Sequence, residues 1–154
     1  MKKVVFSLVL FVFLSYPAYA EDWQTAAIRI AKQYDIEPRV VLALILVESN
    51  GNTDSVNPRS GAVCLMQVVP MRGRPTRSQL LGDVETCIET GVQILRIAID
   101  ATPSLDHAVS AYNTGIHWYR TRGVNWHMVQ MFRDRYANLV YAEPEYVPPK
   151  GIFE

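Results

Sequence analysis

Residues 44–70 read LILVESNGNTDSVNPRSGAVCLMQVVP, an aliphatic run that ends in Glu48, followed by a polar loop and a second apolar strip. The residues three and four positions before Glu48 are Ile45 and Leu44. On a helix these side chains share a face, so the carboxyl group projects along an apolar stripe. Burial beside hydrocarbon disfavours the charged form of a carboxyl group and raises its pKa. Glu48 is therefore a candidate general acid, and the alternative is a helix-end glutamate turned toward water.

The chain begins MKKVVFSLVLFVFLSYPAYAED, with two lysines, an apolar run and small residues at positions 18 and 20. This pattern is typical of a cleaved export signal, and the apolar run is short for a membrane span. We expect residues 1–20 to be a signal peptide, with an uncleaved anchor as the alternative, and the protein to be periplasmic or secreted. We expect membrane contact only during export. The mature chain would carry a net charge of about −2, which does not fit a nucleic-acid-binding protein.

Cys64 and Cys87 are the two cysteines of the chain. An even number of cysteines in an exported protein favours a disulfide, because oxidising compartments drive pairing where the geometry allows it. We predict a bond between Cys64 and Cys87, with two buried thiols as the alternative. The three histidines have no accompanying pattern of metal ligands, and we predict neither a metal nor a cofactor.

Capping residues and hydrophobic periodicity predict a mainly helical chain. Five helices are expected to begin after Asp22, at Pro38, after Asp83, after Ser104 and at about Trp126. The second is apolar on every face and should be central. Gly115 should end the fourth, and the fifth should run to about residue 141. Residues 52–61 and 70–78 read as loops, the latter with three solvated arginines, and AVCLMQVV is either a short strand or a helical turn.

Four motifs occur in one order along the chain: ES at 48–49, VNPRSGAVCLMQ at 56–67, SAYNTG at 110–115 and YANLV at 136–140. Together they resemble the catalytic domain of the soluble lytic transglycosylases. The resemblance covers about residues 23–141. It implies a mainly α, lysozyme-like fold of the goose type, with a small irregular or β-like lobe after the second helix. We therefore expect a catalytic domain at residues 21–142 and a proline-rich tail at residues 143–154.

The resemblance implies an enzyme that cuts peptidoglycan glycan strands between N-acetylmuramic acid and N-acetylglucosamine. In this family the muramic 6-hydroxyl, not water, attacks the anomeric carbon and leaves a 1,6-anhydro end. One carboxyl group suffices, so Glu48 would first donate a proton and then accept one, and the substrate's N-acetyl group would stabilise the cationic intermediate. Asp54 is the other acid between positions 48 and 67, and we expect it to hydrogen-bond its own backbone in a turn rather than to act as a second catalytic acid.

The matching motifs imply further residues that contact the substrate or border the reactive site: Ser49, Met66, Gln67, Tyr112, Asn113 and Tyr136. Structural roles are the alternatives, namely helix termination for Ser49, core packing for Met66, and a place on the packed face of the last helix for Tyr136. Cys64 stands where the family has a glycine, and cysteine restricts close backbone approach and positive φ. Phe132 stands where several members have an acidic residue.

We therefore expect an exported lytic transglycosylase that opens peptidoglycan locally. Small single-domain members of the family often serve machines that cross the wall, such as secretion, conjugation or pilus systems, or phage infection. The sequence does not choose among these partners. The alternatives are a hydrolysing muramidase on the same fold and a wall-binding assembly protein without turnover. The intact residues Glu48, Gln67, Tyr112 and Asn113 argue against the binding protein, whereas Cys64 leaves it open.

Overall fold

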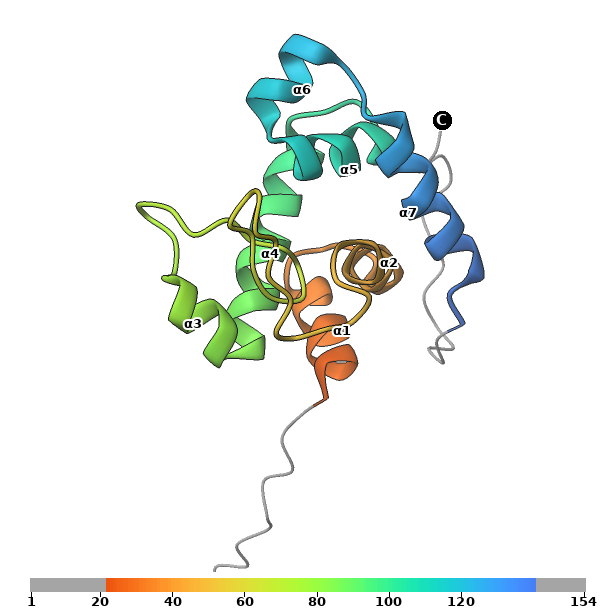
Figure 1. Ribbon diagram of the computed structural model, residues 1–154. Coiled ribbons are helices and arrows are strands. Elements are labelled where there is room, and N and C mark those ends of the chain that lie inside the picture. Colours follow the sequence, from red (N-terminus) through yellow and green to blue (C-terminus); the bar gives the residue numbers. More distant parts are fainter. Residues whose placement is uncertain (1–21, 141–154) are drawn as a thin grey trace, which may run out of the picture.

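The computed structural model describes residues 22–140, and this part of the chain is built from seven α-helices (Figure 1). They are α1 (Trp23–Gln33), α2 (Pro38–Glu48), α3 (Arg77–Gly82), α4 (Val84–Asp100), α5 (Leu105–Thr114), α6 (Ile116–Arg122) and α7 (Trp126–Asn138). The expected signal peptide and the expected tail lie outside the described residues. Among the described helices, none is long and apolar enough to cross a membrane.

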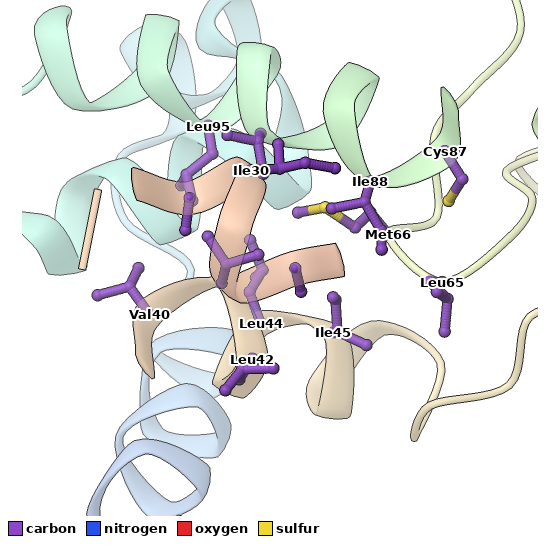
Figure 2. Close-up of a cluster of buried hydrophobic side chains, with 14 of the residues drawn as sticks. Ile30, Val40, Leu42, Leu44, Ile45, Leu65, Met66, Cys87, Ile88 and Leu95 are labelled. Carbon is purple, nitrogen blue, oxygen red and sulfur yellow. The ribbon is translucent and has the colours of Figure 1, made fainter. Parts of the chain in front are cut away.

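The central element is α2, as its apolar sequence predicts. Every residue from Val40 to Ile45 is buried. Figure 1 looks nearly along this helix, with α1, α4, α5 and α7 arranged around it. Leu44 and Ile45 belong to one buried cluster with Ile30 of α1 and Leu95 of α4 (Figure 2). Burial of each such aliphatic side chain contributes about 1.5–3 kcal/mol, so the core fixes the end of α2 that carries Glu48.

Most of the predicted helix starts are confirmed. Asp22 accepts hydrogen bonds from two backbone N–H groups of the first turn of α1, each at 2.9 Å. Asp83 accepts one at 3.1 Å at the start of α4, and Pro38 is the first residue of α2. Ser104 holds the N-cap position of α5, but its side chain makes no capping bond. The predicted end of the last helix near residue 141 is wrong, because α7 ends at Asn138 and the following backbone is extended.

The segment between α2 and α3 forms the small lobe that the resemblance implies. It consists of loops and turns joined by two isolated antiparallel bridges, Val56 with Val63 and Val63 with Val68. No regular strand occurs in residues 22–140, so AVCLMQVV is a bridged turn rather than a strand or a helix. Two short helices were not predicted. The first is α3, which begins with a capping box at Thr76, and the second is α6, between two glycines.

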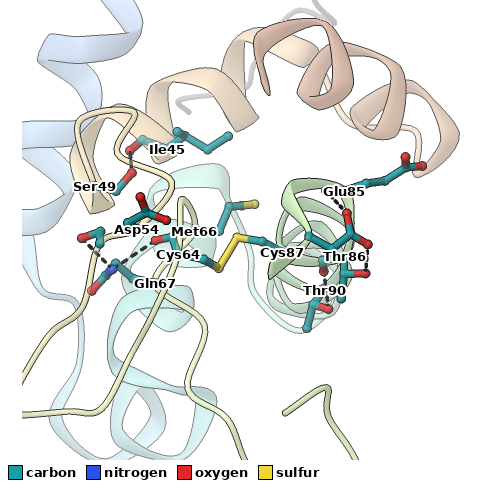
Figure 3. Close-up of a disulfide and its surroundings, with 12 residues drawn as sticks. Ile45, Ser49, Asp54, Cys64, Met66, Gln67, Glu85, Thr86, Cys87 and Thr90 are labelled. Atoms are coloured by element: carbon teal, nitrogen blue, oxygen red, sulfur yellow. Dashed lines mark hydrogen bonds between the residues drawn. A yellow bond between two sulfur atoms is a disulfide. The ribbon is translucent and has the colours of Figure 1, made fainter. Parts of the chain in front are cut away.

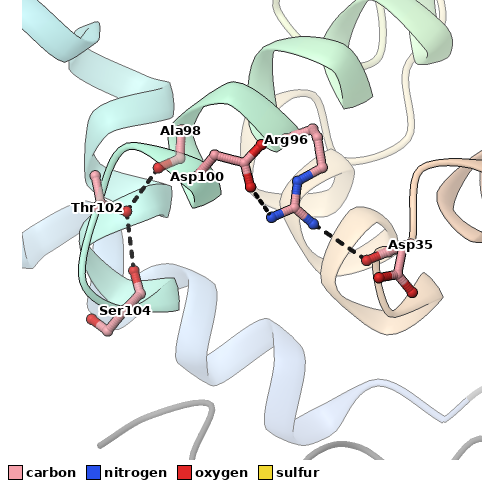
Figure 4. Close-up of polar contacts among 6 residues, drawn as sticks. All are labelled: Asp35, Arg96, Ala98, Asp100, Thr102 and Ser104. Atoms are coloured by element: carbon pink, nitrogen blue, oxygen red, sulfur yellow. Dashed lines mark hydrogen bonds and ion pairs between the residues drawn. The ribbon is translucent and has the colours of Figure 1, made fainter.

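Hydrogen bonds at the corner between α4 and α5 set the direction of α5 (Figure 4). The Thr102 hydroxyl donates to the Ala98 carbonyl at 2.8 Å. Arg96 pairs with Asp100 one turn further along α4 and donates to the Asp35 carbonyl at 3.4 Å. Because Asp35 lies in the turn between α1 and α2, these contacts hold α4 against the central helices. Thr102 also donates to the carbonyl of Ser104, the N-cap of α5, at 3.4 Å and so links α5, which carries the SAYNTG motif, to the end of α4.

Candidate active site

Glu48 is the last residue of α2, at the point where the helix leaves the core. Its side chain is partly buried. Burial raises the pKa of its carboxyl group from 4.5 to about 7, and a hydrogen-bonding interaction with the Asn113 side chain acts in the opposite direction. Burial is the larger effect, so the acid and its conjugate base are both populated near neutral pH. The structure thus confirms the burial and the raised pKa that the apolar residues before Glu48 predict.

The chain reverses immediately after Glu48, and Ser49 takes part in this reversal. The Ser49 backbone N–H and hydroxyl both donate to the Ile45 carbonyl, at 3.0 Å and 3.2 Å. Asn50 and Gly51 follow with φ angles of 54° and 79°, the left-handed conformation that ends helices. Ser49 therefore terminates α2, which is the structural alternative considered for it.

Tyr112 and Asn113 reach Glu48 from the C-terminal end of α5. The Tyr112 hydroxyl donates a hydrogen bond to the Met66 carbonyl at 2.6 Å. Burial raises the pKa of Tyr112 well above its usual value, and the negative charge of Glu48 raises it further. The Asn113 Oδ1 accepts a hydrogen bond from Asn125 at 3.1 Å, which leaves its amide N–H groups for Glu48. The structure therefore brings Glu48, Tyr112 and Asn113 together.

Gln67 belongs to the same site and is held in place by the lobe (Figure 3). Its Nε2 donates to the Ser55 hydroxyl and to the Cys64 carbonyl, each at 3.1 Å. These two bonds leave the Gln67 Oε1 as an acceptor for a hydroxyl or amide group of a substrate. Gln67 lines a groove of about 350 Å³ together with Tyr112, Asn113 and apolar side chains of the lobe and of α4.

Met66 does not line this groove. Its side chain has no exposed surface and packs against α4 at Gly91, where an added Cβ would lie 2.4 Å from the Met66 Sδ. The prediction that Met66 offers an apolar wall to a sugar is therefore wrong. The Met66 side chain packs in the core instead. The contribution of Met66 to the site is its backbone carbonyl, which accepts the hydrogen bond from Tyr112.

The predicted disulfide is present between Cys64 and Cys87 at the start of α4, with a Cα–Cα distance of 6.3 Å (Figure 3). Cys64 has a φ angle of 66°, in the left-handed region that a glycine adopts without strain. Cys64 thus holds a backbone conformation that a glycine at this position would also adopt. It adds a covalent link between the lobe and α4.

Tyr136 lies at the opposite end of α2. Its hydroxyl donates to the Glu37 carboxylate at 2.7 Å, and its ring lies 4.7 Å from the Arg39 guanidinium. Glu37 precedes α2 and Glu48 ends it, so about 16 Å of helix separates the two carboxyl groups. Tyr136 therefore lies away from Glu48, and its contact with substrate stays a prediction. Its position on the packed face of α7 matches the alternative interpretation.

Two residues of the site were not predicted. Asn125 contacts Asn113 and also caps α7 by accepting a hydrogen bond from the Met128 N–H at 3.3 Å. Arg74 lines the groove beside Gln67, and its charge lowers the pKa of Tyr112. The sequence assigned Arg74 to a solvated loop, because only the folded lobe brings it to α5. No local sequence signal identifies either residue.

Comparisons with known proteins agree with this geometry. The sequence pattern of the family described as Transglycosylase SLT domain matches residues 25–124. A transglycosylase of Enterobacteria phage PRD1 is 30% identical over 104 residues, which is 68% of this chain and 37% of the phage protein. The crystal structure of the 70 kDa soluble lytic transglycosylase from Escherichia coli matches with a TM-score of 0.56 and 22% identity.

That match covers 73% of this chain and 21% of the Escherichia coli protein. The chain therefore spans well under half the length of either relative. The shared fold is the mainly helical, lysozyme-like arrangement that the motifs imply. On the match of its residues 25–124, this chain belongs to the transglycosylase SLT domain family.

Proposed function

We propose that this protein is a peptidoglycan lytic transglycosylase in which Glu48 is the sole general acid and base. The observation that carries the proposal is the Glu48 carboxyl group, whose pKa of about 7 results from burial beside two residues of the groove, Tyr112 and Asn113. Near neutral pH, one such group can donate a proton in one step and accept a proton in the next.

Cleavage would proceed in two steps. In the first, protonated Glu48 gives its proton to the glycosidic oxygen as the bond to the muramic C1 breaks, and N-acetylglucosamine leaves as an alcohol. In the second, the Glu48 carboxylate takes the proton of the muramic 6-hydroxyl while that oxygen bonds to C1. This forms the 1,6-anhydro ring and restores the acid. The substrate's N-acetyl group stabilises the cationic intermediate, so a second carboxylate is not needed.

A hydrolysing muramidase is the second candidate, and Asp54 is the observation that favours it. The predicted backbone hydrogen bond of Asp54 is not formed, since the Asn52 side chain accepts the bond in this turn, at 3.0 Å. The Asp54 carboxylate is exposed and has no hydrogen-bond partner within residues 22–140. A free carboxylate in the loop after the general acid is a group that can activate water in an inverting glycosidase.

Mass spectrometry of digested peptidoglycan separates these functions. Anhydro-muramic ends support the transglycosylase, and reducing muramic ends support the muramidase. An absence of products from the folded protein supports the third candidate, a wall-binding protein without turnover. A parallel digest with the Glu48→Gln variant shows whether any product comes from this site rather than from a contaminating enzyme.

The cellular setting is part of the same proposal. Export through residues 1–20 would bring the enzyme to the wall, where local cleavage would serve a wall-spanning machine such as a secretion, conjugation or pilus apparatus. One relative with a similar sequence is a phage transglycosylase, which supports this role. Fusion of residues 1–20 to a reporter that is active only in the periplasm tests the export step.

A further inference from the structure

A second hollow adjoins the groove at Thr114, the last residue of α5, which lines both. It has a volume of about 410 Å³ and is lined by Thr114, Trp118, Arg122, Gly123, Val124 and Asn125. Asn125 donates a hydrogen bond to Asn113 at 3.1 Å, and Asn113 in turn interacts with Glu48. The hollow is therefore joined to the catalytic carboxyl group through two asparagine side chains. The hollow therefore adjoins the proposed catalytic site at Asn113.

The charged group of this hollow is Arg122 of α6. Its guanidinium lies 4.1 Å from the centre of the Trp118 ring, and Trp118 is 49% exposed. A guanidinium that stacks by its face keeps its N–H donors free around its edge. None of the carboxylates in residues 22–140 pairs with Arg122. An arginine that is oriented by an aromatic ring and lacks an acidic partner is suited to bind a carboxylate.

The charge of the surrounding sequence has the same sign. Residues 107–133 contain three arginines and neither aspartate nor glutamate, and one of these arginines, Arg133, pairs with Asp106. Residues 55–82, which include most of the lobe, contain four arginines and no acidic residue. The whole chain has a formal net charge of zero. Positive charge is therefore concentrated in these two segments and is not a property of the whole protein. Such a distribution attracts an anionic ligand to the site between them.

We propose that this hollow binds the carboxylates of the stem peptide that the muramic acid residue of the strand carries. The inference rests on the proposed function, because it assigns part of the same substrate. Arg122 would bind the carboxylate, and the second amide N–H of Asn125, whose first N–H donates to Asn113, would supply a neighbouring donor. The enzyme would then prefer strands that carry peptides over strands from which an amidase has removed them.

The test measures binding in the Glu48→Gln background, where the ligand is not consumed. Three probes are compared: peptide-bearing strands, amidase-stripped strands that keep only the lactyl carboxylate, and a neutral N-acetylglucosamine oligosaccharide. Addition of Arg122→Gln should weaken binding of peptide-bearing strands about tenfold, the scale of one charge-assisted contact, and Arg122→Lys should restore part of it. Arg120→Gln removes the same charge from α6 outside the hollow and should change binding less than about twofold.

The outcomes separate the inference from the function on which it rests. Weaker binding of peptide-bearing strands with unchanged binding of stripped strands supports the inference, whereas weaker binding of stripped strands alone overturns it, because only those strands carry a free lactyl carboxylate. Unchanged binding of all strands, equal weakening of the neutral oligosaccharide, or an equal effect of Arg120→Gln overturns the inference. If the protein with Arg122 intact binds no strand, the proposed substrate is wrong. Binding that is independent of Arg122 refutes the inference alone.

Discussion

Replacement of Glu48 by glutamine should stabilise the protein and abolish its activity. Glutamine keeps the shape of the side chain but cannot ionise, so it removes the free-energy cost of a charge at this partly buried position. It also cannot donate or accept the catalytic proton, and glycan cleavage should fall about a thousandfold or more. A gain in stability together with a loss of turnover is the signature of a functional group held in an unfavourable environment.

The size and pH window of the stability gain follow from the pKa of Glu48. Between pH 4.5 and about 7, the folded protein retains a proton that the unfolded chain has released. The wild type therefore loses stability as the pH rises through this window. The full shift corresponds to about 3 kcal/mol, and the partial exposure of Glu48 reduces the expected value to about 2 kcal/mol. The variant and the wild type should be equally stable near pH 4 and differ by this amount at pH 8.

Urea unfolding of both proteins at several pH values between 4 and 8 measures this difference, which should appear as a midpoint shift of about 1 M at pH 8. Asp54→Asn is the matched control, because it removes an exposed carboxylate that has no hydrogen-bond partner in the described residues. This control should show no pH-dependent gain and should still release anhydro products. A stability difference that does not grow with pH would refute the burial argument. Substantial cleavage by a folded Glu48→Gln protein would refute the mechanism.

Three further predictions concern the framework and the tail. Thiol titration without reductant should find no free thiol, and reduction of the disulfide should lower the free energy of unfolding by about 3 kcal/mol, as expected for a closed loop of about 24 residues. Gly91→Ala should destabilise the fold by about 1–3 kcal/mol in urea unfolding, because its methyl group would collide with Met66, whereas Gly82→Ala meets open space and should not. A chain that stops after Glu143 should fold and cleave purified peptidoglycan, and a loss of either property would extend the catalytic domain into the tail.

Helix starts were predictable where the deciding interaction is local. Asp22 and Asp83 contact backbone groups within three residues, and such contacts follow from the sequence alone. The α6 helix was not predicted, because Gly115 and Gly123 both indicate helix ends and the seven residues between them are too few for a hydrophobic period. Its position depends on packing against α5, which the local sequence does not encode.

In the candidate site, too, the sequence did not predict what depends on tertiary packing. Glu48, Tyr112 and Asn113 were identified because the order of motifs along the chain marks them, and the structure brings them together. The motif that contains Tyr136 was identified equally well. However, a motif does not show against which end of α2 a side chain packs, and Tyr136 packs at Glu37. Residues that reach the site only through tertiary packing, such as Asn125, are not identified by motifs at all.

Cys64 shows how a departure from the family pattern can preserve a site. A left-handed backbone costs an ordinary residue about 1–2 kcal/mol, less than the roughly 3 kcal/mol that the disulfide contributes by closing its loop. Its partner Cys87 and Gly91 lie one turn apart on α4, so they share a face of that helix. Cys64 is bonded to one, and Met66 packs on the other. The loop that carries Gln67 is thus attached to α4 at two neighbouring points. The covalent link therefore offsets the cost of the left-handed conformation at Cys64 and fixes the position of the loop.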